Sequence, residues 1–207
     1  MDTQHLLGFF VSSFIFMNYL AHFFLSNFDE SLIVGNYIAD DVKGKKYLIY
    51  PEEIQKGILL HRAIDGFTDN HITVEKSKSR IRPHQQKFTP VVVDVFYDYL
   101  LAINWQTYTS TALMDYAFYV YKVLQKNQEF LPEKSKFRLQ FMIKQNWLYN
   151  YREIEGIKKA LTGLSNRASF ENKMNEAHIL LIKNKEELNN DFNQFFPALM
   201  AFVKNTL

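Results

Sequence analysis

One short stretch of the sequence places a histidine and two aspartates at the spacing of successive helical turns. His61, Asp65 and Asp69 lie within the segment 57–69. On a helix that advances 100° per residue, these side chains fall within an arc of about 80°. Imidazole and carboxylate groups are ligands of divalent metal ions, so the spacing predicts a metal site. The competing interpretation is a polar helix face with a local contact between imidazole and carboxylate.

A second pair of acids ends the apolar segment before residue 42. Asp40 follows an apolar stripe, and Asp41 comes directly after it. Adjacent side chains on a helix point about 100° apart, so at most one of the two can face a given centre. We expect that one to be Asp40, and we expect Asp41 to lie in a solvated turn with Lys43 and Gly44.

Two more candidates lie in apolar surroundings. Asp98 is flanked by valine, phenylalanine, tyrosine and leucine, and a carboxylate buried there needs a cation or a hydrogen-bond partner. The alternative to a metal role is a hydrogen bond to Trp105 or to a tyrosine hydroxyl. His22, taken alone, is more often a core histidine that is already hydrogen-bonded than a ligand. The chain has no cysteine, which excludes thiolate metal sites, disulfides and cysteine nucleophiles.

These residue types suit metal-assisted hydrolysis. Histidine and carboxylate ligands favour manganese, magnesium or iron, and catalytic zinc less specifically. A bound ion lowers the pKa of water and clamps phosphoryl oxygens, and a nearby Arg62 or Lys43 could neutralise the charge that develops.

The elements that must position these residues are predicted to be helices. The 207 residues include only 7 glycines and 5 prolines, too few for the many tight turns of a sandwich or barrel. Apolar residues at 47 % and charged residues at 22 % are typical of a globular core. The sequence therefore predicts a single-domain, all-α helical bundle, with prolines at helix starts and a bend near Pro197. The expected helices are 18–26, 30–41, 51–69, 90–105, 110–128, 132–149, 153–164 and 170–204.

The N-terminal residues are apolar from Leu6 to Leu25, long enough for a membrane span. Two features argue against a span or a signal peptide. Residues 1–16 contain no lysine or arginine, and Asn18 and His22 would be costly in lipid. Met17 suggests an alternative start, with residues 1–16 as an extension and 17–207 as the helical domain. We expect a cytoplasmic protein, because the chain needs no oxidising compartment.

A group of basic residues without intervening acids occupies 76–87. The net charge of +2 is too balanced for a general nucleic-acid binder, so any electrostatic partner must meet a local patch. The spacing of two scatters these charges around a helix, so a mobile basic loop is as good an interpretation as a patterned face. We expect the group to dock an acidic protein. Its members are Lys76, Lys78, Arg80, Arg82 and Lys87, and the first four are the expected docking residues.

Several motifs match a known family in order and spacing from residue 17 to about 205. They are Met17 through His22, Gly35-Asn36 through Asp40, His61-Arg62-x-Ile64-Asp65, Thr68-Asp69, Tyr97-Asp98 through Asn104-Trp105, Trp147-Leu148, Gly156-Ile157 and Leu164-Ser165-x-Arg167. In these residues the sequence resembles the acyl carrier protein phosphodiesterase family, helical relatives of the metal-dependent HD phosphohydrolases. The resemblance implies an HD-like all-α fold and a manganese-type divalent ion, with Mg²⁺ or Fe²⁺ as alternatives. It also implies removal of 4′-phosphopantetheine from a serine of holo acyl carrier protein.

The resemblance also implies roles for individual residues. The expected metal ligands are Asp40, His61, Asp65 and Asp98. The expected catalytic residues are His22, Arg62 as a phosphate contact, and Asp69; the division between ligands and acid or base stays open.

The sequence departs from the family at two positions. Tyr99 stands where relatives often have histidine, and Asn166 where they have a second basic residue. Two other functions remain alternatives: an HD-like hydrolase of a small phosphorylated metabolite or nucleotide, and a non-enzymatic helical module that binds carrier proteins. The sequence indicates neither a nucleic-acid partner nor an oligomeric state.

Overall fold

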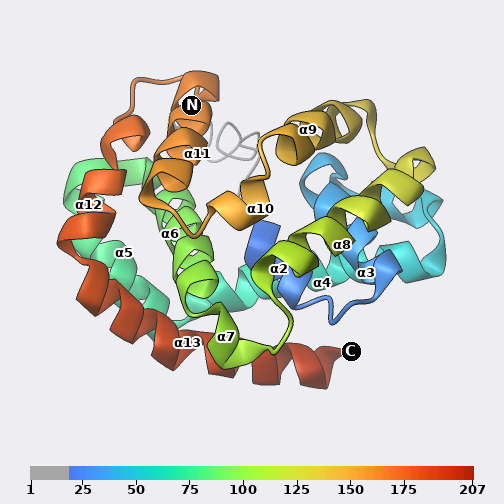
Figure 1. The fold of residues 1–207 in the computed structure, drawn as a ribbon, viewed down its shortest axis with the longest axis horizontal. Coiled ribbons are helices and arrows are strands. Elements are labelled where there is room, and N and C mark those ends of the chain that lie inside the picture. Colours follow the sequence, from blue (N-terminus) through green and yellow to red (C-terminus); the bar gives the residue numbers. More distant parts are fainter. Residues whose placement is uncertain (1–18) are drawn as a thin grey trace, which may run out of the picture.

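Every regular element among residues 19–207, the part of the chain that the computed structural model describes, is a helix (Figure 1). This confirms the predicted all-α class. The predictions for residues 1–16, for the start at Met17 and for most of the apolar N-terminal stretch lie outside the described residues. Within the described part, no helix is both long and apolar enough to cross a bilayer.

The α-helices keep the labels of Figure 1 and are joined by short 3₁₀ turns. The α-helices are α2 (Tyr19–Phe24), α3 (Glu30–Ile38), α4 (Glu52–Asn70), α5 (Ile72–Gln85), α6 (Thr89–Ile103), α7 (Trp105–Tyr108), α8 (Leu113–Lys126), α9 (Glu133–Lys144), α10 (Trp147–Asn150), α11 (Ile154–Arg167), α12 (His178–Lys183) and α13 (Lys185–Thr206). The 3₁₀ turns are η1 (Ala39–Asp41), η2 (Gly44–Ile49), η3 (Gln86–Phe88), η4 (Gln128–Phe130) and η5 (Met174–Glu176).

Helix α6 is the most buried element of the described chain. Its valine-rich start was predicted to be a buried helix rather than a strand, and the structure confirms this: Val91, Val92, Val93 and Val95 are all buried. Helix α6 packs against α2, α5, α11 and α13. Each such buried aliphatic side chain contributes about 1.5 to 3 kcal/mol to folding. The buried side chains of α6 therefore belong to one continuous apolar core.

Helices α3 and α4 cross with their backbones in contact. A Cβ atom at Gly35 would lie 2.3 Å from the carbonyl oxygen of Ile54, and one at Gly57 would lie 2.7 Å from that of Leu32. Real Cβ atoms do not approach so closely, so both positions require glycine. This crossing sets the distance between the end of α3 and the middle of α4.

Several predicted boundaries were wrong. Residues 76–85 belong to helix α5, so the mobile loop proposed for the basic stretch is ruled out. The predicted helix 132–149 is divided at Asn146, whose φ of 45° is left-handed. The segment 170–204 is divided into η5, α12 and α13. In Figure 1, α13 is the long red helix, and it packs against α4, α5 and α6.

Candidate metal centre

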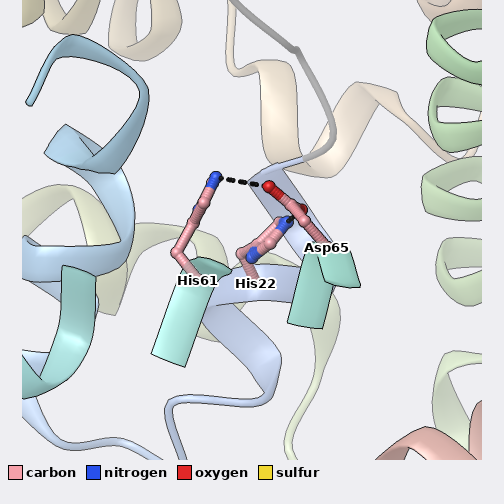
Figure 2. Close-up of side chains that lie close together, drawn as sticks. All are labelled: His22, His61 and Asp65. Atoms are coloured by element: carbon pink, nitrogen blue, oxygen red, sulfur yellow. Dashed lines mark ion pairs between the residues drawn. The ribbon is translucent and has the colours of Figure 1, made fainter. Parts of the chain in front are cut away.

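Two histidines and an aspartate from two helices meet at one point. His22 lies on α2, whereas His61 and Asp65 lie on consecutive turns of α4 (Figure 2). Nε2 of His22 lies 3.2 Å from Oδ1 of Asp65, and Nε2 of His61 lies 3.3 Å from Oδ2. The two imidazole rings stack with their centroids 4.0 Å apart. One ligand atom from each of the three residues lies within 4.8 Å of the others, a spacing compatible with a shared metal ion.

A hydrogen-bond chain fixes the orientation and the tautomer of His22. The Asn36 amide nitrogen donates to Ser26 Oγ over 2.8 Å, and Ser26 Oγ donates to the His22 carbonyl over 3.0 Å. The Asn36 amide oxygen is therefore the acceptor for His22 Nδ1, at 3.2 Å. This places the proton on Nδ1 and leaves the Nε2 lone pair facing Asp65. Asn36 lies in a motif that the sequence analysis quoted, but this role was missed because the amide acts through another residue.

The turn η1 gives its two aspartates different partners. Asp40 faces the centre, with Oδ1 at 3.4 Å from His61 Nε2. The prediction that Asp41 lies in a solvated turn was wrong, because its side chain is only 9 % exposed and its Oδ2 accepts a hydrogen bond from Arg138 over 2.9 Å. Ser135 Oγ donates to the same oxygen. No local pattern in the sequence indicated this ion pair, because Arg138 lies far from Asp41 along the chain.

The two histidines have pKa values shifted in opposite directions. Burial lowers the pKa of His22, and the adjacent His61 lowers it further. Burial also acts to lower the pKa of His61, but Asp65 and Asp40 outweigh it and raise the pKa to about 10. Desolvation acts to raise the pKa of Asp65, but the two histidines outweigh it and hold the pKa below its usual range.

The residues at this centre fit a divalent cation. Both ring nitrogens of His61 are buried and, among the described residues, have no hydrogen bond of acceptable geometry. Its Nε2 lies only in ion-pair contact with Asp65 and Asp40, a position that a metal ion could take in exchange for the imidazole proton. Two imidazoles with two carboxylates form a nitrogen and oxygen donor set typical of manganese, iron or zinc. His22, His61 and Asp40 are enclosed, whereas the Asp65 side chain is 42 % exposed. The centre therefore opens to solvent on the Asp65 side.

Asp98 lies behind this centre, with its carboxylate against the start of α2. Its two oxygens accept hydrogen bonds from the backbone N–H groups of Leu20 and Ala21 over 3.0 and 2.9 Å. The alternative of a bond to Trp105 was wrong, because Trp105 Nε1 donates to the Thr111 carbonyl. Asp98 therefore caps the helix that carries His22.

Arg62 contacts the backbone beyond η1 rather than the centre. Its guanidinium donates to the carbonyl oxygens of Val42 and Gly44 over 2.7 and 3.0 Å and lies over the ring of Tyr47. These bonds hold the segment that follows Asp40 and Asp41.

A second group of charges lies next to Asp65. Lys78 is buried and donates to Asp69 over 2.7 Å. Burial raises the pKa of Asp94 well above its usual range; Asp65 and Asp69 raise it further, and Lys78 opposes them. Asp94 is thus a further candidate at this site that the sequence analysis did not select. Its only sequence signal is its spacing of four from Asp98 in the apolar helix.

Three of the four predicted docking residues are neutralised by ion pairs. Besides Lys78, Arg80 pairs with Asp191 of α13, and Arg82 pairs over 2.7 Å with a glutamate of its own helix. Lys78 is buried, so it cannot contribute to a docking surface. Lys76 and Arg82 are exposed, and the docking role stays a prediction that rests on these two.

Comparison with known proteins supports one family. The model of the acyl carrier protein phosphodiesterase family matches residues 17–199. An acyl carrier protein phosphodiesterase of Enterobacter sp. (strain 638) is 30 % identical over 190 residues, covering 91 % of this chain and 98 % of the relative. A protein of the same name from Klebsiella pneumoniae subsp. pneumoniae is also 30 % identical over 190 residues, with the same coverage. No solved structure matches, so the HD-like part of the fold prediction is untested. The match spans nearly the whole chain, which therefore belongs to the acyl carrier protein phosphodiesterase family.

Proposed function

We propose that this chain is a metal-dependent phosphodiester hydrolase that removes 4′-phosphopantetheine from the serine of holo acyl carrier protein. The observation that carries the proposal is the convergence of His22, His61 and Asp65 from two helices, with their ligand atoms within 4.8 Å. Family membership supports the carrier protein as substrate. We further propose that the enzyme acts in the cytoplasm with Mn²⁺, with Mg²⁺ and Fe²⁺ as alternatives.

In this proposal His22, His61, Asp65 and Asp40 hold the cation. His22 joins the ligands because its Nε2 carries a lone pair and faces the same carboxylate as His61. Such an ion supplies Lewis acidity and a water of lowered pKa. Asn36 orients His22, and Arg62 orients the turn that carries Asp40.

In this proposal the substrate binds on the solvent-exposed side of the metal centre. Asp65 is the exposed member of the ligand group, so the phosphodiester approaches from its side. Asp94, whose pKa burial and the charge of Asp65 raise, supplies a proton-holding carboxyl near Asp65, and Lys78 holds Asp69 in place beside it. Lys76 and Arg82, on the surface of α5, attract the acidic carrier protein.

The test is mass spectrometry of holo carrier protein incubated with the enzyme and Mn²⁺. The expected result is conversion to the apo form with release of phosphopantetheine, and no conversion after chelation. His61→Ala should abolish turnover while circular dichroism remains unchanged. His84→Ala, which removes an exposed histidine from α5, is the matched control and should retain activity.

Two results would overturn the proposal. The first is that the enzyme leaves holo carrier protein intact with Mn²⁺, Mg²⁺ or Fe²⁺ but hydrolyses a small phosphodiester. That result would favour the alternative function, hydrolysis of a small phosphorylated metabolite. The other is full activity of His61→Ala.

A further inference from the structure

A large cavity lies between α9, α10 and α11. Its volume is about 1010 Å³, at the upper end of the range of small-molecule sites. Phe137, Phe141 and Trp147 form an aromatic wall. Among its charged lining residues, four are basic and two are acidic, an excess of positive charge. The lining suits a long, partly apolar ligand that carries negative charge.

A buried arginine with unused donors lines this cavity. Arg138 is only 8 % exposed, and its Nη2 binds Asp41 over 2.9 Å and Ser135 Oγ over 3.2 Å. Its Nε and Nη1 have no hydrogen-bond partner within residues 19–207. A buried charged donor without an acceptor is costly. Because guanidinium is permanently charged and only donates, the missing partner is a hydrogen-bond acceptor, and an anion suits it best.

Two neighbouring groups strengthen this interpretation. The guanidinium lies over the ring of Tyr19, 5.6 Å from its centroid, and the Tyr19 hydroxyl is also buried without a hydrogen bond among the described residues. Arg167 lines the same cavity. Burial lowers the pKa of Arg167, and Arg138 lowers it further, so the two cations are close enough to repel each other. The cavity wall thus contains two guanidinium groups, a positive charge that suits a ligand with an anionic end.

The inner wall of the cavity is directly connected to the metal centre. Asp41, the partner of Arg138, is the sequence neighbour of Asp40, which faces His61. Tyr19 lies one helical turn before His22 on α2. A ligand whose anionic end reaches Arg138 therefore lies next to the turn that carries Asp40.

We infer that this cavity binds the phosphopantetheine arm of the substrate, with its phosphate end at Arg138 and its chain along the aromatic wall. The inference rests on the proposed function. The arm carries one phosphate, two amides and a dimethyl group. The phosphate matches Arg138, the amides match the side-chain amide of Gln145, and the dimethyl group matches the aromatic rings. A phosphate alone would leave the aromatic wall without a partner, and a plain alkyl chain would leave Arg138 without one.

The test is a fluorescence titration of the full chain in the presence of a chelator, so that binding is measured without turnover. Trp147 lines the cavity and reports on it, whereas Trp105 is buried in the core. We expect 4′-phosphopantetheine to quench the signal saturably. Pantetheine, which lacks the phosphate, should bind about 10- to 100-fold more weakly because it loses charge-assisted hydrogen bonds. Inorganic phosphate should leave the signal unchanged.

A variant that fills the cavity tests arm binding without removing a charge. Gly163 lines the cavity, and a Cβ there would meet only Arg167, at 3.8 Å or more. Gly163→Leu should weaken arm binding and raise KM for holo carrier protein by about tenfold or more, since the side chain occupies the ligand's space. Asn166→Leu, an exposed change on the same helix, should alter neither value. Arg138→Lys should weaken binding while the fold is retained.

The outcomes separate this inference from the proposed function. His61→Ala should bind the arm normally, because it leaves the cavity intact. Arm binding by an enzyme that cannot cleave the carrier would support the cavity and overturn the function. Normal cleavage and an unchanged KM in Gly163→Leu would overturn the cavity and leave the function standing. Equal binding of pantetheine, or binding of palmitate in place of phosphopantetheine, would also overturn the inference.

Discussion

The backbone contact between α3 and α4 predicts that Gly57→Ala destabilises the protein. The added Cβ would lie 2.7 Å from the Leu32 carbonyl oxygen, 2.8 Å from the Cα of Gly35 and 2.9 Å from the Cα of Leu32. All three atoms belong to backbone, so no side-chain rotation can make room. The helices must move apart, and His61, one turn further along α4, moves with them.

The size of the effect follows from two opposing contributions. Alanine is favoured over glycine inside a helix by about 1 kcal/mol. Overpacking of a closely packed site costs about 1 to 3 kcal/mol, and occasionally more. A methyl group added at Gly66, in the same helix, would have no atom within 4 Å, so Gly66→Ala should show the gain alone. The helix preference is common to both variants and cancels, so we expect them to differ by the overpacking cost, about 1 to 3 kcal/mol in the free energy of unfolding.

The assay is urea unfolding of both variants followed by circular dichroism, with thermal unfolding as a second measurement. For a chain of this length the difference corresponds to about 2 to 12 °C in Tm. Gly66→Ala should be at least as stable as the parent protein, and Gly57→Ala clearly less stable. Equal stability of the two variants would refute the view that the helices touch at Gly57.

Three further predictions follow from the site and its surroundings. Asn36→Ala should weaken Mn²⁺ binding about 10- to 100-fold in calorimetry, because the partner that orients a ligand is lost; unchanged affinity would contradict the assigned hydrogen-bond chain. Burial raises the pKa of Asp98 to about 8 despite its two backbone N–H bonds, so the folded state holds this proton more tightly than the unfolded state. The stability it supplies is present at low pH and is lost as the pH rises toward and past that value. Between about pH 5 and pH 8.5 the unfolding free energy of the parent should therefore fall by about 1 to 3 kcal/mol relative to Asp98→Asn, as measured by urea unfolding; a constant difference would argue against a raised pKa. The double variant Lys76→Glu and Arg82→Glu should raise KM for the carrier protein at low salt without changing Tm. Lys78→Glu should lower Tm, because it breaks a buried ion pair. The reverse pattern would show that the exposed and buried residues were misassigned.

Local periodicity was enough to predict the parts of the site that lie on one helix. His61 and Asp65 are four residues apart, and the helical repeat alone places their side chains on one face. The scarcity of glycine and proline was likewise enough for the all-α class. Asp40 was selected because it follows an apolar stripe, whereas His22, taken alone, read as a core histidine and gained a role mainly through its place in the family motifs.

The remaining features depend on contacts between distant segments. Arg138 meets Asp41 from 97 positions away, and no periodicity in either segment indicates that pairing. The basic residues of α5 are spaced by two, a spacing that suggested a loop as an alternative to a helix. The segment is helical, and its Lys78 and Arg80 form ion pairs with residues of α4 and α13, which the sequence pattern could not indicate. The glycine crossing of α3 and α4 was missed for the same reason, since each glycine matters only because the other helix lies against it.

The turn from Ala39 to Asp41 connects the metal centre to the cavity wall through two adjacent residues. One carboxylate faces His61 of the metal centre, and the next holds Arg138 in the cavity wall. Consecutive residues are linked by a planar peptide unit that resists twisting. In the proposed binding mode, a movement of Arg138 together with Asp41 would therefore act on the backbone of Asp40, one of the proposed metal ligands.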